Sequence, residues 1–152
     1  MDIIIAADDA KFLPGHVQYF SVPWDIGARK TKEILYESRF IEAEEALALG
    51  FVNRVVPRTD LESETLAQAE RIAETDSFVT QMIKFSVNQA QDAMGFRTAV
   101  RAALPNYLLI QTQGGMAPSE PDGTSTRRLR PVDQALRKLK QHRSNNPAPP
   151  AS

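Results

Sequence analysis

The chain of 152 residues contains no cysteine, which excludes disulfide bonds, thiolate nucleophiles and thiolate metal ligands. Histidine is scarce too. Its two copies, His16 and His142, lie far apart in the sequence, so a histidine-based metal site would need several carboxylates to complete it. We therefore expect no metal site. The absence of cysteine also fits a reducing compartment.

Long hydrophobic runs are missing as well. The opening segment MDIIIAADD has no basic residues before its apolar run, which is far shorter than a signal peptide or the roughly 20 residues that span a bilayer. We expect a soluble, cytoplasmic protein without a membrane partner. Its 42% of hydrophobic and 24% of charged residues are a normal globular balance, and the length suits one domain.

The formal charge of −1 hides a basic segment at residues 127–143, where Asp133 is the only acid. Its seven cations leave 11 of the 18 basic residues and 18 of the 19 acidic residues to the rest of the chain. A basic helix without interleaved aromatic residues is a weak sign of nucleic-acid binding. We therefore favour a solvated arm, with anion or nucleic-acid binding as the alternative. The seven cations are Arg127, Arg128, Arg130, Arg137, Lys138, Lys140 and Arg143.

The first half of the chain predicts short, alternating elements. A β-branched run at Ile3–Ile5 predicts a strand that ends before the turn at Asp8-Asp9. Residues 10–25, punctuated by prolines, are expected to form a loop with one short extended piece, and residues 26–38 a helix. A short helix over residues 42–49 should end at Gly50, a residue suited to a left-handed cap, and residues 51–56 then predict a strand.

The second half predicts helices. Thr59 and Glu62 have capping-box spacing and would open a helix that reaches about Glu74. After a turn at residues 75–77, the next helix carries one apolar stripe and ends at Gly95; a further helix contains Pro105, which should kink it. Such stripes form a core or an oligomer interface. The two apolar faces consist of Val79, Ile83, Val87, Ala90 and Met94, and of Val100, Ala103, Leu104, Tyr107 and Leu108.

The segment IEAEEALALGFVNRVVP, residues 41–57, resembles the crotonase superfamily, the enoyl-CoA hydratase/isomerase family. In this family a short A-x-E-A-x-x-x-G helix turns at glycine into a strand of the type (F/L)-V-N-x-V-V-P. The flanking segments DIIIAADDAKF, GARKTKEIL and ERIAETDSFVTQMIKFSVNQA are similar to the family as well. The matching positions are Ala43, Glu45, Ala46, Gly50, Val52, Asn53, Val55, Val56 and Pro57.

The resemblance divides the chain and implies its fold class. Residues 1–112 would be the C-terminal portion of a crotonase-like domain, a partial ClpP/crotonase-like α/β fold dominated by helices with few short strands. Residues 113–126 have the composition of a flexible linker, residues 127–143 form the basic arm, with a helix over about 130–141, and residues 144–152 predict a disordered tail.

The same resemblance implies an activity. Members of the family bind acyl-CoA thioesters, and two backbone N–H groups stabilise an enolate-like oxyanion while one or two carboxylates move protons. The nominal reactions are hydration and isomerisation of an enoyl-CoA. The thioester is a substrate, and no separate cofactor is implied. The family's C-terminal helices build a trimer, so we expect a homo-oligomer or association with full-length relatives.

The chain departs from the family pattern in two places. The family's oxyanion amides and first catalytic glutamate belong to a part of the fold that precedes the matching segment. A second departure is that an acid-bearing stretch, which in the family usually lies between Phe12 and Pro14-Gly15, is absent here. These departures predict a truncated enzyme that is weakly active or inactive. The alternative is a non-catalytic remnant that serves helix-mediated assembly.

Three residues of the loop are the candidates for lining an acyl pocket: His16, Tyr19 and Trp24. The competing interpretation is a hydrophobic plug in which the aromatic rings are buried and His16 is partly exposed. Asp25 would cap the following helix. No residue is assigned as catalytic.

Among the other polar residues, we expect structural or solvent-exposed roles. Asp8 and Asp9 suit a turn, and Asn53 and Arg54 should hold the strand in place. The remaining acids are expected on solvated helix faces: Glu33, Glu37, Glu42, Glu44 and Glu45.

Overall fold

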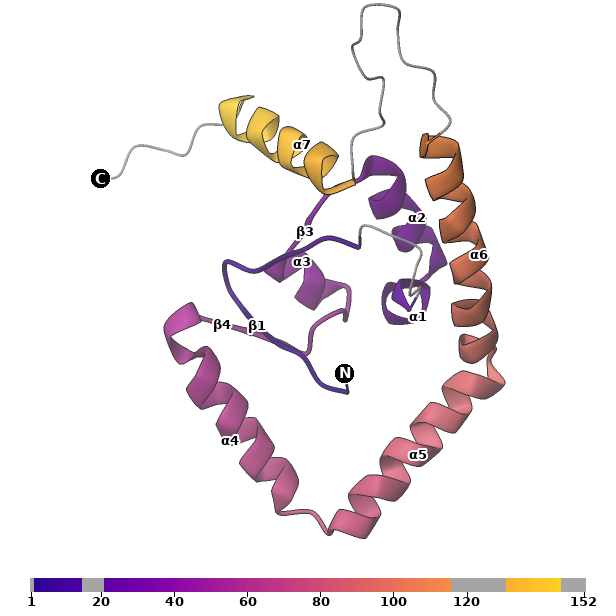
Figure 1. Ribbon diagram of the computed structural model, residues 1–152. Coiled ribbons are helices and arrows are strands. Elements are labelled where there is room, and N and C mark those ends of the chain that lie inside the picture. Colours follow the sequence, from indigo (N-terminus) through magenta and orange to yellow (C-terminus); the bar gives the residue numbers. More distant parts are fainter. Residues whose placement is uncertain (1, 15–20, 116–130, 146–152) are drawn as a thin grey trace, which may run out of the picture.

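The computed structural model describes residues 2–14, 21–115 and 131–145. The described chain is dominated by helices, and its strands form two short two-stranded sheets. Figure 1 shows the sheet of β1 and β4 beside α3 near the centre, with α4, α5 and α6 following one another around it. This architecture confirms the expected helix-dominated α/β class. None of the described helices is both long enough and apolar enough to cross a membrane.

The central sheet pairs β1 (Ile5–Ala7) in parallel with β4 (Arg54–Val56), with Ile5 opposite Arg54. The strand predicted at residues 3–5 was therefore placed two residues too early. The reason is that Ile4 already has other partners: its N–H donates to the side-chain Oδ1 of Asn53, and its C=O accepts from the Asn53 N–H, both at 2.8 Å. The ladder begins only at Ile5.

Helix α3 (Ala43–Ala48) leads into β4 through the predicted left-handed glycine, Gly50, whose φ is +73°. The N–H groups of Phe51 and Val52 both donate to the Ala46 carbonyl, at 2.9 and 3.3 Å. These amides satisfy the end of the helix instead of a strand ladder. The strand predicted over residues 51–56 is thus reduced to Arg54–Val56.

Helix α1 (Val22–Ile26) lies in the region predicted to be a loop. The prediction treated Pro23 as a helix breaker, whereas it occupies the first turn of α1, where no intrahelical N–H is required. Gly27, with φ +80°, separates α1 from α2 (Ala28–Glu37). The helix predicted over residues 26–38 is therefore two elements.

The hydrophobic core is small and lies between α2, α3 and the sheets. A second sheet pairs β2 (Lys11–Phe12) with β3 (Ile41–Glu42) in antiparallel fashion. Phe12 of β2 meets Phe51 edge to face, with ring centroids 5.3 Å apart. These contacts hold the start of the chain against residues 41–52. The buried cluster consists of Ala6, Ile34, Ile41, Ala46 and Val52.

Helix α4 (Leu61–Ala73) follows a short 3₁₀ turn at Arg58–Asp60. The predicted capping box is wrong, because the Thr59 hydroxyl donates to Oδ1 of Asp60 at 2.8 Å and the N-cap residue, Asp60, makes no side-chain capping bond. The extra turn moves the helix start beyond Thr59. The helix ends one residue before the predicted Glu74.

Helices α5 (Ser77–Ala93) and α6 (Phe96–Gly115) meet at Gly95, whose φ is +96°. Asp76 caps α5 by accepting from the N–H groups of Phe78 and Val79 at 3.0 and 3.1 Å. The stripe on α5 was expected to be core or interface, yet α5 buries no residue within the described chain. A core role is therefore wrong, and an interface role stays a prediction. The exposed members include Ile83 at 57% and Met94 at 65%.

Helix α6 buries Ala103, while Leu104 and Leu108 of its predicted face stay about half exposed. Pro105 lies inside the helix, as predicted. The helix continues to Gly115, so it extends into the expected linker, whose residues 116–126 lie outside the described chain.

Helix α7 (Pro131–Asn145) contains the described part of the basic arm. Its Ala135 is 1% exposed, and Lys138 Nζ donates to the main-chain carbonyl of Glu37 at the end of α2. The arm therefore contacts the rest of the protein, although Arg137, Lys138 and Lys140 keep exposed side chains. Arg127, Arg128, Arg130 and the tail from residue 146 lie outside the described residues.

Candidate functional site

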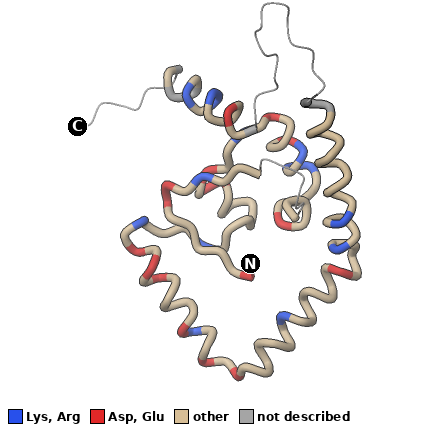
Figure 2. Tube along the Cα trace, viewed as in Figure 1, with Lys and Arg blue, Asp and Glu red and all other residues tan. Residues whose placement is uncertain are grey.

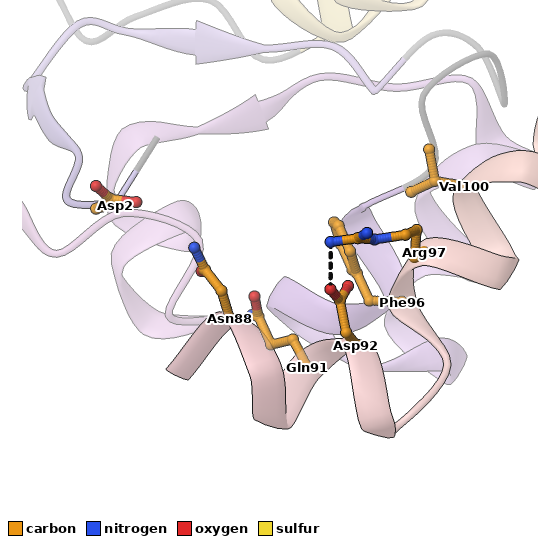
Figure 3. Close-up of a pocket in the computed structure, with 7 residues that line it drawn as sticks. All are labelled: Asp2, Asn88, Gln91, Asp92, Phe96, Arg97 and Val100. Atoms are coloured by element: carbon orange, nitrogen blue, oxygen red, sulfur yellow. Dashed lines mark ion pairs between the residues drawn. The ribbon is translucent and has the colours of Figure 1, made fainter. Parts of the chain in front are cut away.

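A hollow of about 390 Å³ lies at the junction of α5 and α6, opposite the N-terminal segment. Figure 3 shows Asp2 on one side and side chains from the end of α5 and the start of α6 on the other. Its size falls within the usual range of small-molecule sites. Its lining residues are Asp2, Asn88, Gln91, Asp92, Phe96, Arg97 and Val100.

Two neutral amides supply the hydrogen-bonding groups of the hollow. Asn88 and Gln91 lie three residues apart on α5, a spacing that places both side chains on one face of a helix. Neither amide has a hydrogen-bond partner among the described residues. Figure 3 shows both side chains extending from α5 toward the space in front of Asp2. They are therefore available to a ligand.

The charged groups around the hollow are paired. Lys84 Nζ lies 2.7 Å from Oδ2 of Asp2, and Arg97 Nη2 lies 2.6 Å from Oδ2 of Asp92. The hydrogen bond from Lys84 lowers the pKa of the Asp2 carboxyl, so this group is ionised near neutral pH. Among the described residues, no group of three His, Cys, Asp or Glu side chains could hold a metal ion.

An aromatic contact joins the hollow to α1. The ring of Phe96, which lines the hollow, lies edge to face with the ring of Trp24, with centroids 5.8 Å apart and planes at 72°. Both side chains are half-buried. Of the three predicted pocket residues, Trp24 is thus placed behind one wall of the hollow. His16 and Tyr19 lie outside the described residues.

The sequence suggested that Asp25 caps the next helix. In the structure Asp25 instead follows Trp24 inside α1. Gly27 occupies the N-cap position of α2, so the predicted role of Asp25 is wrong. Partial burial raises the pKa of the Asp25 carboxyl, and a hydrogen bond with Ser21 opposes this rise. A carboxyl with a raised pKa can hold a proton more readily than an exposed one, but no described contact links it to the hollow.

The other acids have structural partners. Asp8 and Asp9 form the predicted turn, and Arg58 Nε donates to the Asp9 carboxylate at 2.8 and 2.9 Å. Asn53 holds Ile4, as described above, and Arg54 Nη2 lies 2.8 Å from Oε2 of Glu64. These contacts agree with the structural roles that the sequence suggested.

Of the five glutamates predicted on solvated faces, all except the half-buried Glu45 are exposed, as predicted, but several of them also form ion pairs. Arg39 donates to Glu45 through Nη1 and Nη2 at 2.7 and 2.8 Å, and it also binds Glu33 and Glu37 at 3.2 and 2.8 Å. The hydrogen bonds from Arg39 are the main cause that lowers the pKa of Glu45. Glu42 pairs with Lys11 across β2 and β3. The cluster therefore stabilises the join of α2 and α3.

The sequence did not predict the hollow. Asn88 belongs to a segment that resembles the family, but no site role was predicted for it, and Gln91, Phe96 and Arg97 were not singled out. One pattern in the sequence could have indicated this site. Asn88 and Gln91, three residues apart, form a polar helix face, and Gly95-Phe96 then indicates a sharp turn at the end of the helix. Nothing in the sequence indicated that Asp2 would lie opposite them.

Comparison with known proteins adds a consistent set of relatives. The sequence model described as enoyl-CoA hydratase/isomerase matches residues 1–107. The chain is 42% identical over 122 residues to EchA13 of Mycobacterium tuberculosis, which is named as an enoyl-CoA hydratase; the match covers 75% of this chain and 38% of that protein. This chain therefore spans well under half the length of that relative.

The chain is also similar in fold to solved structures described as enoyl-CoA hydratases. A probable enoyl-CoA hydratase from Mycobacterium thermoresistibile superposes with a TM-score of 0.69 at 39% identity, over 74% of this chain and 50% of that one. An enoyl-CoA hydratase/isomerase from Xanthobacter autotrophicus Py2 also gives a TM-score of 0.69, at 27% identity, over 97% of this chain and 55% of that one.

Proposed function

The chain belongs to the enoyl-CoA hydratase/isomerase family, and on this basis we propose that it acts on acyl-CoA thioesters, by hydration or isomerisation of an enoyl-CoA. The observation that supports this proposal is the match between the family's sequence model and residues 1–107 of the chain. The reaction uses no cofactor apart from the thioester substrate, and the protein acts in the cytoplasm. Trp24, with His16 and Tyr19, contributes to the wall of the acyl pocket.

We expect the 152-residue chain by itself to be weakly active or inactive. The family resemblance assigns the oxyanion amides and the first glutamate to residues that precede the segment matched here. Removal of a single oxyanion donor lowers kcat by about 10²–10³-fold, so turnover at a site of this type depends on both amides. Asp25 has a raised pKa, but it does not replace a pair of oriented amides.

The test is to incubate the 152-residue protein with a short enoyl-CoA and follow the absorbance of the conjugated thioester. Mass spectrometry of the product separates hydration, which adds one water, from isomerisation, which leaves the mass unchanged. A full-length relative serves as the positive control. We expect thioester binding with a rate far below that of the relative. An equal rate would refute the expected weak activity, and the absence of both binding and turnover would refute the acyl-CoA proposal.

A second candidate function is assembly without catalysis, in a trimer-like homo-oligomer or with full-length relatives. The observation that favours it is the apolar face of α5, with Val79, Ile83 and Val87 exposed at 46, 57 and 54%. Figure 2 shows that α5 carries few charged residues. An exposed apolar face of this kind is typical of a protein–protein contact surface.

Light scattering after size-exclusion chromatography tests this candidate. We expect a mass above that of one chain, and Ile83→Lys should shift it toward the monomer because it places a charge within the apolar face. Gln81→Lys adds the same charge at an exposed residue outside the predicted stripe and should leave the mass unchanged. A monomeric wild-type protein, or equal effects of both variants, would exclude assembly through α5.

A further inference from the structure

The exposed side of α2 separates paired charges from unpaired ones. The two acids of the helix, Glu33 and Glu37, both bind Arg39, at 3.2 and 2.8 Å. Arg29 and Lys32 are also exposed, but neither has a hydrogen-bond or ion-pair partner among the described residues. The positive charges of Arg29 and Lys32 are therefore not neutralised by a neighbouring acid.

Tyr36 lies on the same side of α2 as these two cations. The three residues follow one another at intervals of three and four, which places their side chains on one face of a helix, over about 10 Å of its axis. The opposite face is the buried one, with Thr31 and Ile34. Tyr36 is 82% exposed and has no partner within the described chain. Together, Arg29, Lys32 and Tyr36 form what we term the basic face of α2.

Helix α7 brings further positive charge to the C-terminal end of α2. Lys138 Nζ donates to the main-chain carbonyl of Glu37, the residue after the exposed tyrosine, and Figure 1 shows α7 beside the end of α2. A carbonyl is neutral, so Lys138 keeps its charge. Arg137 and Lys140 are exposed and have no partner among the residues that the structure describes. The described side chains of α7 thus include three cations and one acid, Asp133.

We propose that the basic face of α2, continued by the cations of α7, binds a single-stranded nucleic acid. Cations without acidic partners attract phosphates, and an exposed aromatic ring offers a surface on which a base can stack. The bases of a single strand can turn toward such a ring, whereas those of a duplex are already stacked on one another. The basic segment by itself was a weak sign of such binding because it lacks aromatic residues, and the structure adds Tyr36 from α2.

The make-up of this surface favours a nucleic acid over other anionic partners. An anionic membrane would also attract the cations, but a helix that lies on a bilayer inserts an apolar face. The basic face of α2 has no aliphatic side chain, and of the described apolar side chains of α7 only Val132 and Leu136 are exposed, at 37 and 43%. A carboxylate-rich peptide would use the cations and leave Tyr36 without a role. The proposal is independent of the acyl-CoA reaction, because none of its residues lines the hollow or belongs to the predicted acyl pocket.

The test is a titration of the whole 152-residue protein into a labelled oligoadenylate RNA strand of about 12 nucleotides, followed by fluorescence anisotropy. We expect saturable binding that weakens as salt is added. Arg29→Gln/Lys32→Gln should bind at least tenfold more weakly and lower the slope of log K against log salt by about 1.4, because two cations no longer contact phosphates. The matched control, Arg71→Gln/Lys84→Gln, removes the same charge at exposed residues of α4 and α5 and should bind as the wild type does.

Substitutions of Tyr36 give a second readout that does not depend on charge. Tyr36→Ala should weaken binding about tenfold and leave the salt slope unchanged, because it removes the stacking surface and no cation. Tyr36→Phe should retain the affinity of the wild type, since its ring can still stack. Circular dichroism verifies that each variant folds.

The outcomes separate this surface from the proposed reaction. The absence of saturable binding, equal losses in the two double variants, or wild-type affinity in Tyr36→Ala overturns the proposal. Equal affinity for a duplex of the same length, or binding to phosphatidylserine vesicles in place of the strand, overturns it too. A saturating short enoyl-CoA should not displace the strand, and displacement would assign the surface to the thioester instead. Strand binding that both the double variant and Tyr36→Ala weaken supports the proposal, whether or not the chain turns over an enoyl-CoA.

Discussion

Asn53 and Ile4 are joined by two hydrogen bonds of 2.8 Å, one through the Asn53 side chain and one through its main chain. The side-chain bond ends the β1–β4 ladder by occupying the N–H of Ile4. An aliphatic residue at position 53 could pack at this edge but could not accept that hydrogen bond.

Asn53→Ala should therefore lower the free energy of unfolding by about 1 kcal/mol, the net value of a typical hydrogen bond. Urea denaturation measures this change. Asn88→Ala is the control, because Asn88 is an exposed asparagine without a described partner, and its effect should be close to zero. Equal destabilisation by the two substitutions would contradict the role of Asn53.

Arg39→Met should reduce stability at neutral pH by about 1 kcal/mol or less, because the pairs that it breaks are partly exposed. Glu45 has a pKa below its ordinary value of 4.5 in the folded protein, first because of the hydrogen bond from Arg39. A lowered carboxyl pKa stabilises the folded state above the unfolded pKa, and this contribution is lost as the pH falls through the folded pKa.

The difference in unfolding free energy between wild type and Arg39→Met should thus be largest above about pH 5 and shrink in more acidic solution. Urea denaturation over this pH range measures it. Arg71→Met is the matched control, since Arg71 donates to the neutral side chain of Gln68. A difference that stays constant with pH would exclude the Arg39–Glu45 contact as its source.

Phe96→Leu should change the fluorescence of Trp24 and lower the unfolding free energy by about 1 kcal/mol, because it removes an edge-to-face aromatic pair. Since the chain has one tryptophan, the tryptophan emission comes from Trp24 alone and responds to changes in its surroundings. Phe78→Leu makes the same change on α5 at a side chain that is 66% exposed. It should leave the spectrum unaltered; a shift of equal size would show that the emission does not depend on Phe96.

Asp76→Ala should destabilise the start of α5 by about 1 kcal/mol, because the N–H groups of Phe78 and Val79 lose their acceptor. Hydrogen exchange of the first turn of α5 measures the effect and should be faster in the variant. Asp76→Asn retains a side-chain oxygen and should restore most of the protection. Unchanged exchange in Asp76→Ala would mean that the cap does not hold this turn.

The sequence predicted those parts of the fold that depend on local chemistry. Gly50 and Gly95 end their helices in left-handed conformations because few other residues adopt positive φ without strain. The family segment at residues 41–57 was recognised for the same reason, since its helix, turn and strand follow one another directly. Helix α1 was missed because the first-turn position of Pro23 was not recognised.

Features that depend on distant contacts were predicted less well. The start of β1 is set by Asn53, and the hollow is formed by Asp2 together with residues of α5 and α6. The stripe on α5 has the periodicity of a buried face, but periodicity does not indicate which surface covers it. His16 and Tyr19 lie outside the described residues, so of the predicted pocket only Trp24 is placed.

The parallel pairing of β1 with β4 has a consequence for the order of folding. The hydrogen bond between Ile4 and Asn53 joins residues 49 positions apart, and closing so long a loop costs chain entropy before the contacts of the core repay it. Helices α5 and α6, by contrast, are neighbours in sequence and meet at Gly95. Local contacts form faster than distant ones, so these helices should appear early in refolding and the core around Ile34 and Val52 late.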